Sequence, residues 1–214
     1  NGSATSPADY AAGSGTLSFA PGVTTQTVTL NISDDAVFEG NETFSVLLSG
    51  AVNATIADGN GLATITDNNV PTIAVSSPTV GEGGDAIFTV SLSNASTTAV
   101  TFNPTLASGT ATVGTDTASA PEYFNGTAWA AVPVGGVTIA AGSTSVQVRV
   151  ATTDDFAAEG NETFTLTATV TAGSTSNASA VGTATITDDI DATTLALTAT
   201  PSVAEGGTIT YTVS

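Results

Sequence analysis

The sequence of 214 residues contains no cysteine, no histidine and no methionine, and its one basic residue is Arg149. Without cysteine, no disulfide bond can stabilise the fold. Without histidine or cysteine, the chain cannot form Ser-His-Asp or Cys-His catalytic groups, or an ordinary zinc site, from its own residues. One basic residue against 19 acidic ones also leaves almost nothing to bind nucleic-acid phosphates or an anionic membrane surface.

Charge of either sign is scarce, since charged residues make up 9% of the chain and apolar residues 41%. This apolar content is too high for an intrinsically disordered protein. The longest uncharged segment, residues 123–148, is interrupted by glycine and proline, so it does not predict a membrane-spanning helix. We therefore expect a globular protein with no membrane insertion in this segment.

Apolar and polar residues alternate with a period of two in many short segments, for example at Val28, Leu30 and Ile32. Clusters of Gly, Asn, Asp and Pro separate these segments, and no stretch of ten or more residues has helical periodicity. The pattern predicts an all-β fold of tandem, seven-stranded, Ig-like antiparallel sandwiches. Its predicted core comprises Phe88, Val90, Val148, Val150, Phe164, Leu166 and Ile186.

The chain also repeats itself. DDAVFEGNETF, which begins at Asp34, recurs as DDFAAEGNETF 120 residues later at Asp154. ATITDN at Ala63 recurs as ATITDD at Ala184, and SSPTVGEGG recurs as ATPSVAEGG. These offsets divide the chain into the later part of one repeat (residues 1–70), a complete repeat (71–190) and the opening of a third (191–214). We expect neither terminal piece to fold well alone and the chain to belong to a longer tandem array.

The acidic residues gather in recurrent turn motifs that flank strands. Loops at one end of a sandwich can converge from distant parts of the sequence, where several carboxylates would repel one another and raise one another's pKa values. Ca²⁺ could offset this charge, because it takes roughly six to eight oxygen ligands, whereas Mg²⁺ keeps more of its water. The alternative, that Asp and Asn simply favour solvated turns, stays open.

Residues 9–68, from "DYAAGSGTLSFAPG" to "ATITDN", resemble the Calx-beta domain, which occurs in sodium/calcium exchangers and in giant bacterial surface proteins. The matching features are the Asp-Tyr pair, the FAPG turn, the DD…EGNETF segment and the closing ATITD. The resemblance implies calcium at the pole where one domain meets the next. The implied ligands of the complete repeat are Glu82, Asp154, Asp155, Glu159, Asp188, Asp189 and Asp191. Those of the preceding repeat are Asp9, Asp34, Asp35, Glu39 and Asp67.

Three departures leave assignments open. Asn68 replaces an Asp, which weakens or removes a site in residues 1–70. In the complete repeat Glu122-Tyr123 replaces Asp-Tyr within a longer insert, so a ligand role for Glu122 is in doubt. Glu42 and its counterpart Glu162 are either ligands or exposed turn residues.

The insert itself contains the only tryptophan, Trp129, and Asn125-Gly126 predicts a hairpin turn there. Tyr123 and Trp129 would then form either a lid packed on the sandwich or a sugar-binding platform.

The favoured function is a calcium-stiffened extender in a large secreted or cell-surface repeat protein of the bacterial adhesin type, serving adhesion, a biofilm matrix or an extracellular filament. Its partners would be neighbouring repeats, with lateral or end-to-end self-assembly left open. The alternative is a regulatory calcium-sensing module. A hydrolase using paired carboxylates is disfavoured, because the duplicated acid pairs have no cleft-forming insertion apart from the Trp129 hairpin.

Overall fold

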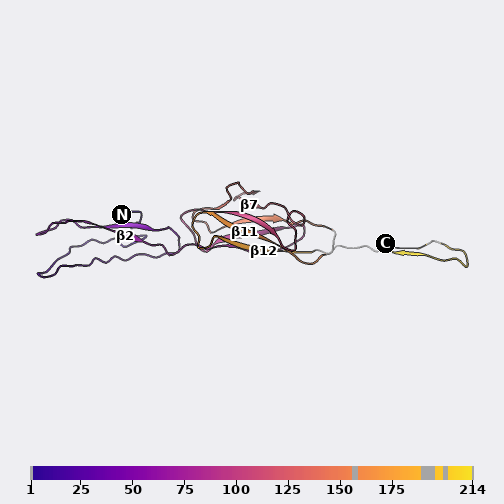
Figure 1. Ribbon diagram of the computed structural model, residues 1–214, viewed down its shortest axis with the longest axis horizontal. Coiled ribbons are helices and arrows are strands. Elements are labelled where there is room, and N and C mark those ends of the chain that lie inside the picture. Colours follow the sequence, from indigo (N-terminus) through magenta and orange to yellow (C-terminus); the bar gives the residue numbers. More distant parts are fainter. Residues whose placement is uncertain (1, 156–158, 189–195, 200–201, 214) are drawn as a thin grey trace.

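A computed structural model describes residues 2–155, 159–188, 196–199 and 202–213. The protein is elongated, with an N-terminal piece (residues 1–70), a central repeat (71–190) and a C-terminal piece (191–214) arranged in a row (Figure 1). The described residues form β-strands and no helix, which confirms the all-β prediction. In that part of the chain there is accordingly no apolar helix of membrane-spanning length.

The central repeat is a sandwich of two five-stranded sheets. The first sheet has the order β3 (Ile73–Val75), β5 (Asp85–Leu92), β10 (Ser145–Ala151), β7 (Glu122–Phe124) and β8 (Trp129–Ala131). The second has the order β4 (Thr79–Gly81), β12 (Ser179–Thr187), β11 (Glu162–Ala172), β6 (Val100–Ser108) and β9 (Val137–Ile139).

The core lies between these two sheets. Alternate residues of each strand point inward, as the period of two predicts. Phe88 of β5 and Phe164 of β11 meet edge to face, with ring centroids 5.8 Å apart. All seven predicted core residues are confirmed, because none of their side chains is more than 2% exposed.

Two strand predictions for the central repeat need correction: its described residues form ten strands rather than seven, and one pair of strands is parallel. The first strand is divided before Pro78, which has no N–H to donate to a ladder. β3 pairs antiparallel with β5, whereas β4 pairs parallel with β12. The insert adds the antiparallel hairpin of β7 and β8.

The N-terminal piece contains one hairpin, β1 (Glu42–Leu47) with β2 (Asn60–Ile65), and a small core in which Tyr10 stacks on Phe44 at 4.4 Å. The strand expected over residues 28–32 is wrong: only a single bridge from Ile32 to Tyr10 forms. In the central repeat the corresponding strand, β10, pairs with β5, and residues 1–70 contain no counterpart of β5. Val28 therefore remains 49% exposed.

The described part of the C-terminal piece is an antiparallel pair, β13 (Leu197–Ala199) with β14 (Tyr211–Val213).

Candidate metal centre

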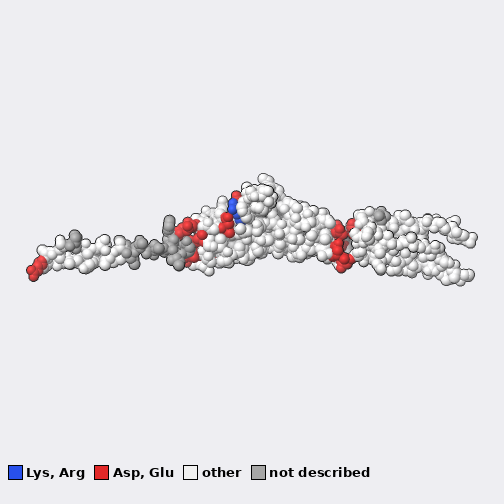
Figure 2. All heavy atoms as spheres, turned by 180° about the vertical axis from the view of Figure 1, so that it is seen from behind, with Lys and Arg blue, Asp and Glu red and all other residues white. Residues whose placement is uncertain are grey.

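Acidic side chains gather at both ends of the central repeat (Figure 2). Six carboxylate residues of the N-terminal piece line one cavity of about 290 Å³, together with Asn68. They are Asp9, Asp34, Asp35, Glu39, Glu42 and Asp67. All five residues that the resemblance implies for this repeat are thus brought together. Glu42, which the sequence left open, joins them.

The register of the hairpin brings two of these carboxylates, Glu42 and Asp67, to the same end of the hairpin. Glu42 opens β1 opposite Ile65, two residues before Asp67. Asp67 then closes the acidic loop, because its Oδ2 accepts hydrogen bonds from the backbone N–H groups of Glu39 (2.5 Å) and Gly40 (2.9 Å). Its Oδ1 accepts a third from Asn69 N–H at 2.7 Å. A single aspartate therefore fixes both the loop and the start of the linker to the next repeat.

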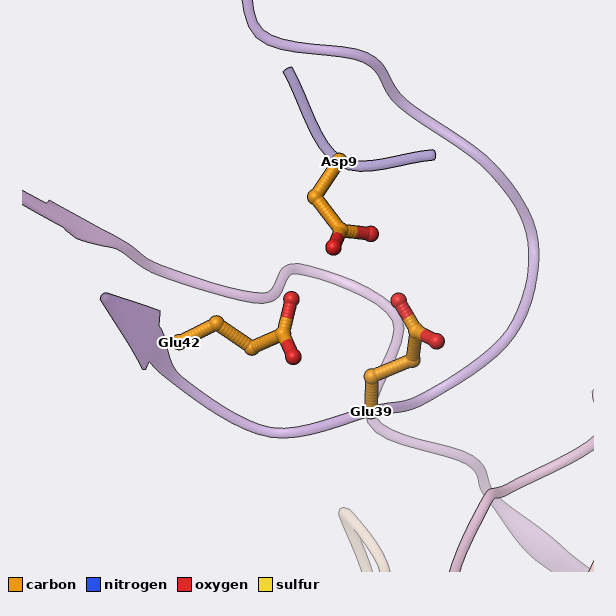
Figure 3. Close-up of side chains that lie close together, drawn as sticks. All are labelled: Asp9, Glu39 and Glu42. Carbon is orange, nitrogen blue, oxygen red and sulfur yellow. The ribbon is translucent and has the colours of Figure 1, made fainter. Parts of the chain in front are cut away.

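Asp9 reaches the cluster from a separate turn. Its Oδ2 accepts hydrogen bonds from the backbone N–H of Thr5 (2.5 Å) and from the Thr5 hydroxyl (3.1 Å). One oxygen each of Asp9, Glu39 and Glu42 lie within 4.8 Å of one another, and the three carboxylates face a common space (Figure 3). That spacing allows the three groups to share one cation.

The electrostatics of this cluster are unfavourable for a protein alone. Burial, followed by the charges of Asp9 and Glu39, raises the pKa of Glu42. Burial also raises the pKa of Glu39, to which the charges of Asp9, Asp35 and Asp67 add. The chain's one basic residue, Arg149, is bound elsewhere, to Asp85 and Glu122. No Lys or Arg side chain therefore supplies positive charge to the cluster.

Asp9 and Asp67 have lowered pKa values, so these two carboxylates of the cluster are held in the ionised form. The backbone N–H of Thr5 is the main cause of the lowered pKa of Asp9. For Asp67, burial favours the neutral form, but hydrogen bonds from Asn69, Glu39 and Gly40 outweigh it and lower the pKa. Anionic and protonatable carboxylates thus sit together in one cavity, as in a site prepared for a cation.

A second cluster lies at the far end of the central repeat. The Glu82–Gly84 turn rests against Asp154, since a methyl group added at Gly83 would lie 3.1 Å from Asp154 Cβ. Asp188 directly follows β12, and one of its carboxylate oxygens is buried with no hydrogen-bond partner among the described residues. Burial raises the pKa of Glu162, and the charges of Asp116, Glu159 and Asp155 raise it further. The predicted ligands Asp189 and Asp191 lie outside the described residues.

Asp116, a member of this second cluster, was missed by the sequence analysis. Thr112 N–H donates to Asp116 Oδ2 at 2.6 Å, as Thr5 N–H does to Asp9. The matching of Asp9 with Glu122 is therefore wrong: Glu122 instead accepts hydrogen bonds from Arg149 Nε (2.8 Å) and Nη2 (2.6 Å). A signal was present, because Gly-(Ser/Thr)-Ala-Thr-x3-Asp begins at both Gly2 and Gly109.

The insert forms the predicted hairpin. Asn125 Oδ1 accepts the N–H groups of Thr127 and Ala128, both at 3.0 Å, which closes the Asn125-Gly126 turn. Phe124 and Trp129 are cross-strand partners with ring centroids 5.5 Å apart.

Adjacent residues of a strand point to opposite faces, so Tyr123 lies on the face away from Phe124 and Trp129. Tyr123 packs against the core, while the Arg149 guanidinium lies 4.9 Å from the centre of the Trp129 ring. The two rings therefore do not form a shared sugar-binding platform.

One known protein family matches most of the chain. The model of one protein family, the Calx-beta domain, matches residues 1–69 and 66–190. Among solved structures, the apo-form Calx CBD1 domain is 20% identical, with a TM-score of 0.40, covering 56% of this chain and 99% of that one. CBD12 from CALX1.2 is also 20% identical, with a TM-score of 0.39, covering 55% of this chain and 46% of that one. No curated protein matches the sequence.

Proposed function

Because this chain belongs to the Calx-beta domain family, we propose that its two acidic clusters bind Ca²⁺ and that the bound ions add to the stiffness of the joints between tandem repeats. The observation that carries this proposal is the convergence of six carboxylates on one cavity in the N-terminal piece, whose 70 residues include no Lys, Arg or His.

The donor set suits a hard cation. The cavity offers carboxylate oxygens and the amide of Asn68, without nitrogen or sulfur ligands from His or Cys. Ca²⁺ takes roughly six to eight such oxygens in flexible geometry, whereas Mg²⁺ demands a strict octahedron and retains water. Asp9, Glu39 and Glu42 would hold the ion, and its charge would remove the repulsion that raises the pKa values of Glu39 and Glu42.

The position of the clusters supports a mechanical role. Each lies at an end of the central repeat, where the chain passes to a neighbouring piece (Figures 1 and 2). Neutralising charge there would favour one fixed angle between repeats. The protein would act as an extender segment of a large secreted or cell-surface protein, with neighbouring repeats as its partners. No step in this role requires catalysis.

Isothermal titration of the metal-free chain with CaCl₂, and separately with MgCl₂, tests the proposal. We expect calcium binding that is lost for the N-terminal cluster in the double variant Asp9→Asn/Glu42→Gln. Asp58→Asn is the matched control, because Asp58 lies outside both clusters and its Oδ1 accepts Asn60 N–H, which an amide oxygen can also do.

The affinity separates the two functions. A dissociation constant near the millimolar range fits an extracellular strut, while a micromolar value favours the regulatory calcium-sensing module. Absence of calcium binding to the unmodified chain would overturn both.

A further inference from the structure

The loop that carries the acidic residues of the N-terminal piece also contacts the central repeat through its main chain. Phe38 N–H donates to the carbonyl of Ala95 at 2.8 Å, and Thr97 N–H donates to the carbonyl of Phe38 at 2.8 Å. The Thr97 hydroxyl donates to the same carbonyl at 3.2 Å. Phe38 and Ser96 thereby form an isolated parallel β-bridge between the two repeats.

A second contact fixes the linker. Asn94 Nδ2 donates to the carbonyl of Asn69 at 2.6 Å. The Asn94 side chain is itself oriented, because its Oδ1 accepts a hydrogen bond from the Ser93 hydroxyl at 2.7 Å. Since Asn69 N–H donates to Asp67, the linker residue is held from the N-terminal piece on one side and from the central repeat on the other.

The surface that receives Phe38 is part of the folded central repeat. Ser96 is only 1% exposed, and its carbonyl accepts Gly142 N–H at 2.8 Å. Its hydroxyl accepts Thr98 N–H at 3.1 Å. Ser96 is thus held by bonds within the central repeat, while the carbonyl of Ala95 and the N–H of Thr97 on either side of it bind Phe38.

The loop is equally prepared on its own side. Val37 N–H donates to Asp35 Oδ1 at 2.7 Å, and the N–H groups of Glu39 and Gly40 donate to Asp67. Phe38 lies between these capped residues, and its own N–H and C=O are both directed to the central repeat. The carboxylates that line the cavity therefore also shape the segment that docks.

We infer that Phe38, Ala95 and Thr97, with Asn69 and Asn94, form an inter-repeat latch that holds the first joint closed without metal. Small interfaces between domains usually permit relative motion. Here, however, a short linker keeps the docking groups at high effective concentration, and two independent contacts oppose opening. This inference goes beyond the proposed function, because it assigns the metal-free rigidity of this joint to main-chain bonds rather than to an ion.

Spin-label distances across the joint test the latch. The chain has no cysteine, so Thr64→Cys on β2 and Thr105→Cys on β6, both at exposed positions, give a unique labelled pair. In chelator we expect one narrow distance distribution. Thr97→Pro removes the N–H that donates to Phe38, and Asn94→Ala removes the linker contact. Combining both changes should abolish the narrow population in chelator.

Thr97→Val is the matched control, because it keeps the N–H and removes only the hydroxyl, and it should retain the narrow distribution. Trp129 fluorescence verifies that each variant keeps a folded central repeat, since this is the chain's only tryptophan. If Thr97→Pro disturbs folding, Asn94→Ala alone is the test. It leaves the Phe38 bridge intact and should broaden the distance distribution partly, and an unchanged distribution would count against the linker contact.

A broad distribution for the unmodified chain in chelator would overturn the latch, as would a narrow one in the folded double variant. Neither result bears on calcium binding, which is measured separately by titration of the same proteins. A latch that holds while no calcium binds would leave this inference intact and remove the proposed function.

Discussion

Asp9 and Asp116 occupy the same position in two successive repeats. In each, the carboxylate accepts a hydrogen bond from the backbone N–H of a threonine four residues earlier, at 2.5 Å in the N-terminal piece and 2.6 Å in the central repeat. The alanine before that threonine in each repeat donates its N–H to the carbonyl of Thr43 or Thr163, both at 3.0 Å. The turn thus carries one carboxylate to the acidic end of each repeat, although the residues that follow differ in length and sequence.

Replacement of Asp116 by Asn should weaken calcium binding at the second cluster. The amide oxygen can still accept Thr112 N–H, so the turn should persist while one negative charge is lost. Calcium affinity follows the number of charged ligands, and we expect a loss of about tenfold or more. Isothermal titration measures it. Glu122→Gln is the control, and an equal loss in both variants would mean that the effect is general charge reduction rather than ligation.

The metal-free central repeat should become more stable as the pH falls toward the ordinary glutamate pKa of 4.5, because the pKa of Glu162 is raised in the folded state. The folded protein then holds its proton where the unfolded chain has lost it, so stability falls as pH rises from 4.5 through the raised value. Urea unfolding followed by Trp129 fluorescence in chelator measures this slope. Glu162→Gln should flatten it, and an unchanged slope would assign the effect to other groups.

With calcium present, we expect the stability of the protein to rise, rather than fall, as the pH increases above about 4.5. Ligand carboxylates must be deprotonated, so protons compete with the ion and its stabilisation is lost as the pH falls. Asp9 and Asp67 should resist this competition best, since their pKa values are lowered. Titration with CaCl₂ at neutral pH and near pH 5 checks the prediction, and an affinity independent of pH in this range would contradict carboxylate ligation.

Arg149 should contribute modestly to the stability of the insert hairpin. It binds Asp85 at 2.9 Å and Glu122 at 2.6 Å, and it stacks on Trp129. All three charged side chains are 27–43% exposed, so water screens these pairs. We expect Arg149→Met to lower the free energy of unfolding only slightly. Urea denaturation measures the loss. The stability of Arg149→Lys, which keeps the charge but not the planar group, should lie between that of the unmodified chain and that of Arg149→Met.

The sequence predicted the fold class and the core well, because burial of alternate residues is a local property of each strand. Phe88, Phe164 and Ile186 could be assigned to the core without knowing the strand order. The parallel pairing of β4 could not be predicted in this way, since it depends on which sheet the chain joins after the break before Pro78. The prediction of a strand over residues 28–32 failed for a related reason. Apolar and polar residues do alternate there, but a strand forms only when a neighbouring strand is present to pair with it.

The acidic cluster of the N-terminal piece was predicted from spacing and resemblance, and the structure brings those residues to one cavity. Asp116 was missed because the comparison followed the Tyr that adjoins Asp9, and Thr117 takes the place of that Tyr. The turn depends instead on the Thr backbone N–H and the carboxylate four residues later. Contact between Phe38 and the central repeat left no sequence signal, because its main-chain groups make the bonds and any residue except proline could make them.

Calcium should lengthen the protein, and the change should arise mainly at the second joint. In chelator we expect the latch to hold the first joint, and we expect the negative charges of Asp154, Asp155 and Asp188, which have no basic side chain to pair with, to repel one another where the central repeat ends. Bound calcium would offset that repulsion, and at a tenfold excess over the dissociation constant it stabilises the bound form by about 1.4 kcal/mol per site. That energy is small for a fold but large for a hinge between a few conformations.

Small-angle X-ray scattering of the full chain should therefore show a larger maximum dimension in millimolar calcium than in chelator. The double variant Asp154→Ala/Asp155→Ala should remove most of this difference, because the second cluster then lacks two of its negatively charged ligands. The same pair of changes at Asp34 and Asp35 should remove less of it, because main-chain bonds already hold the first joint. Equal dimensions in calcium and chelator for the unmodified chain, together with measurable calcium binding, would show that the ions occupy the clusters without setting the angle between repeats.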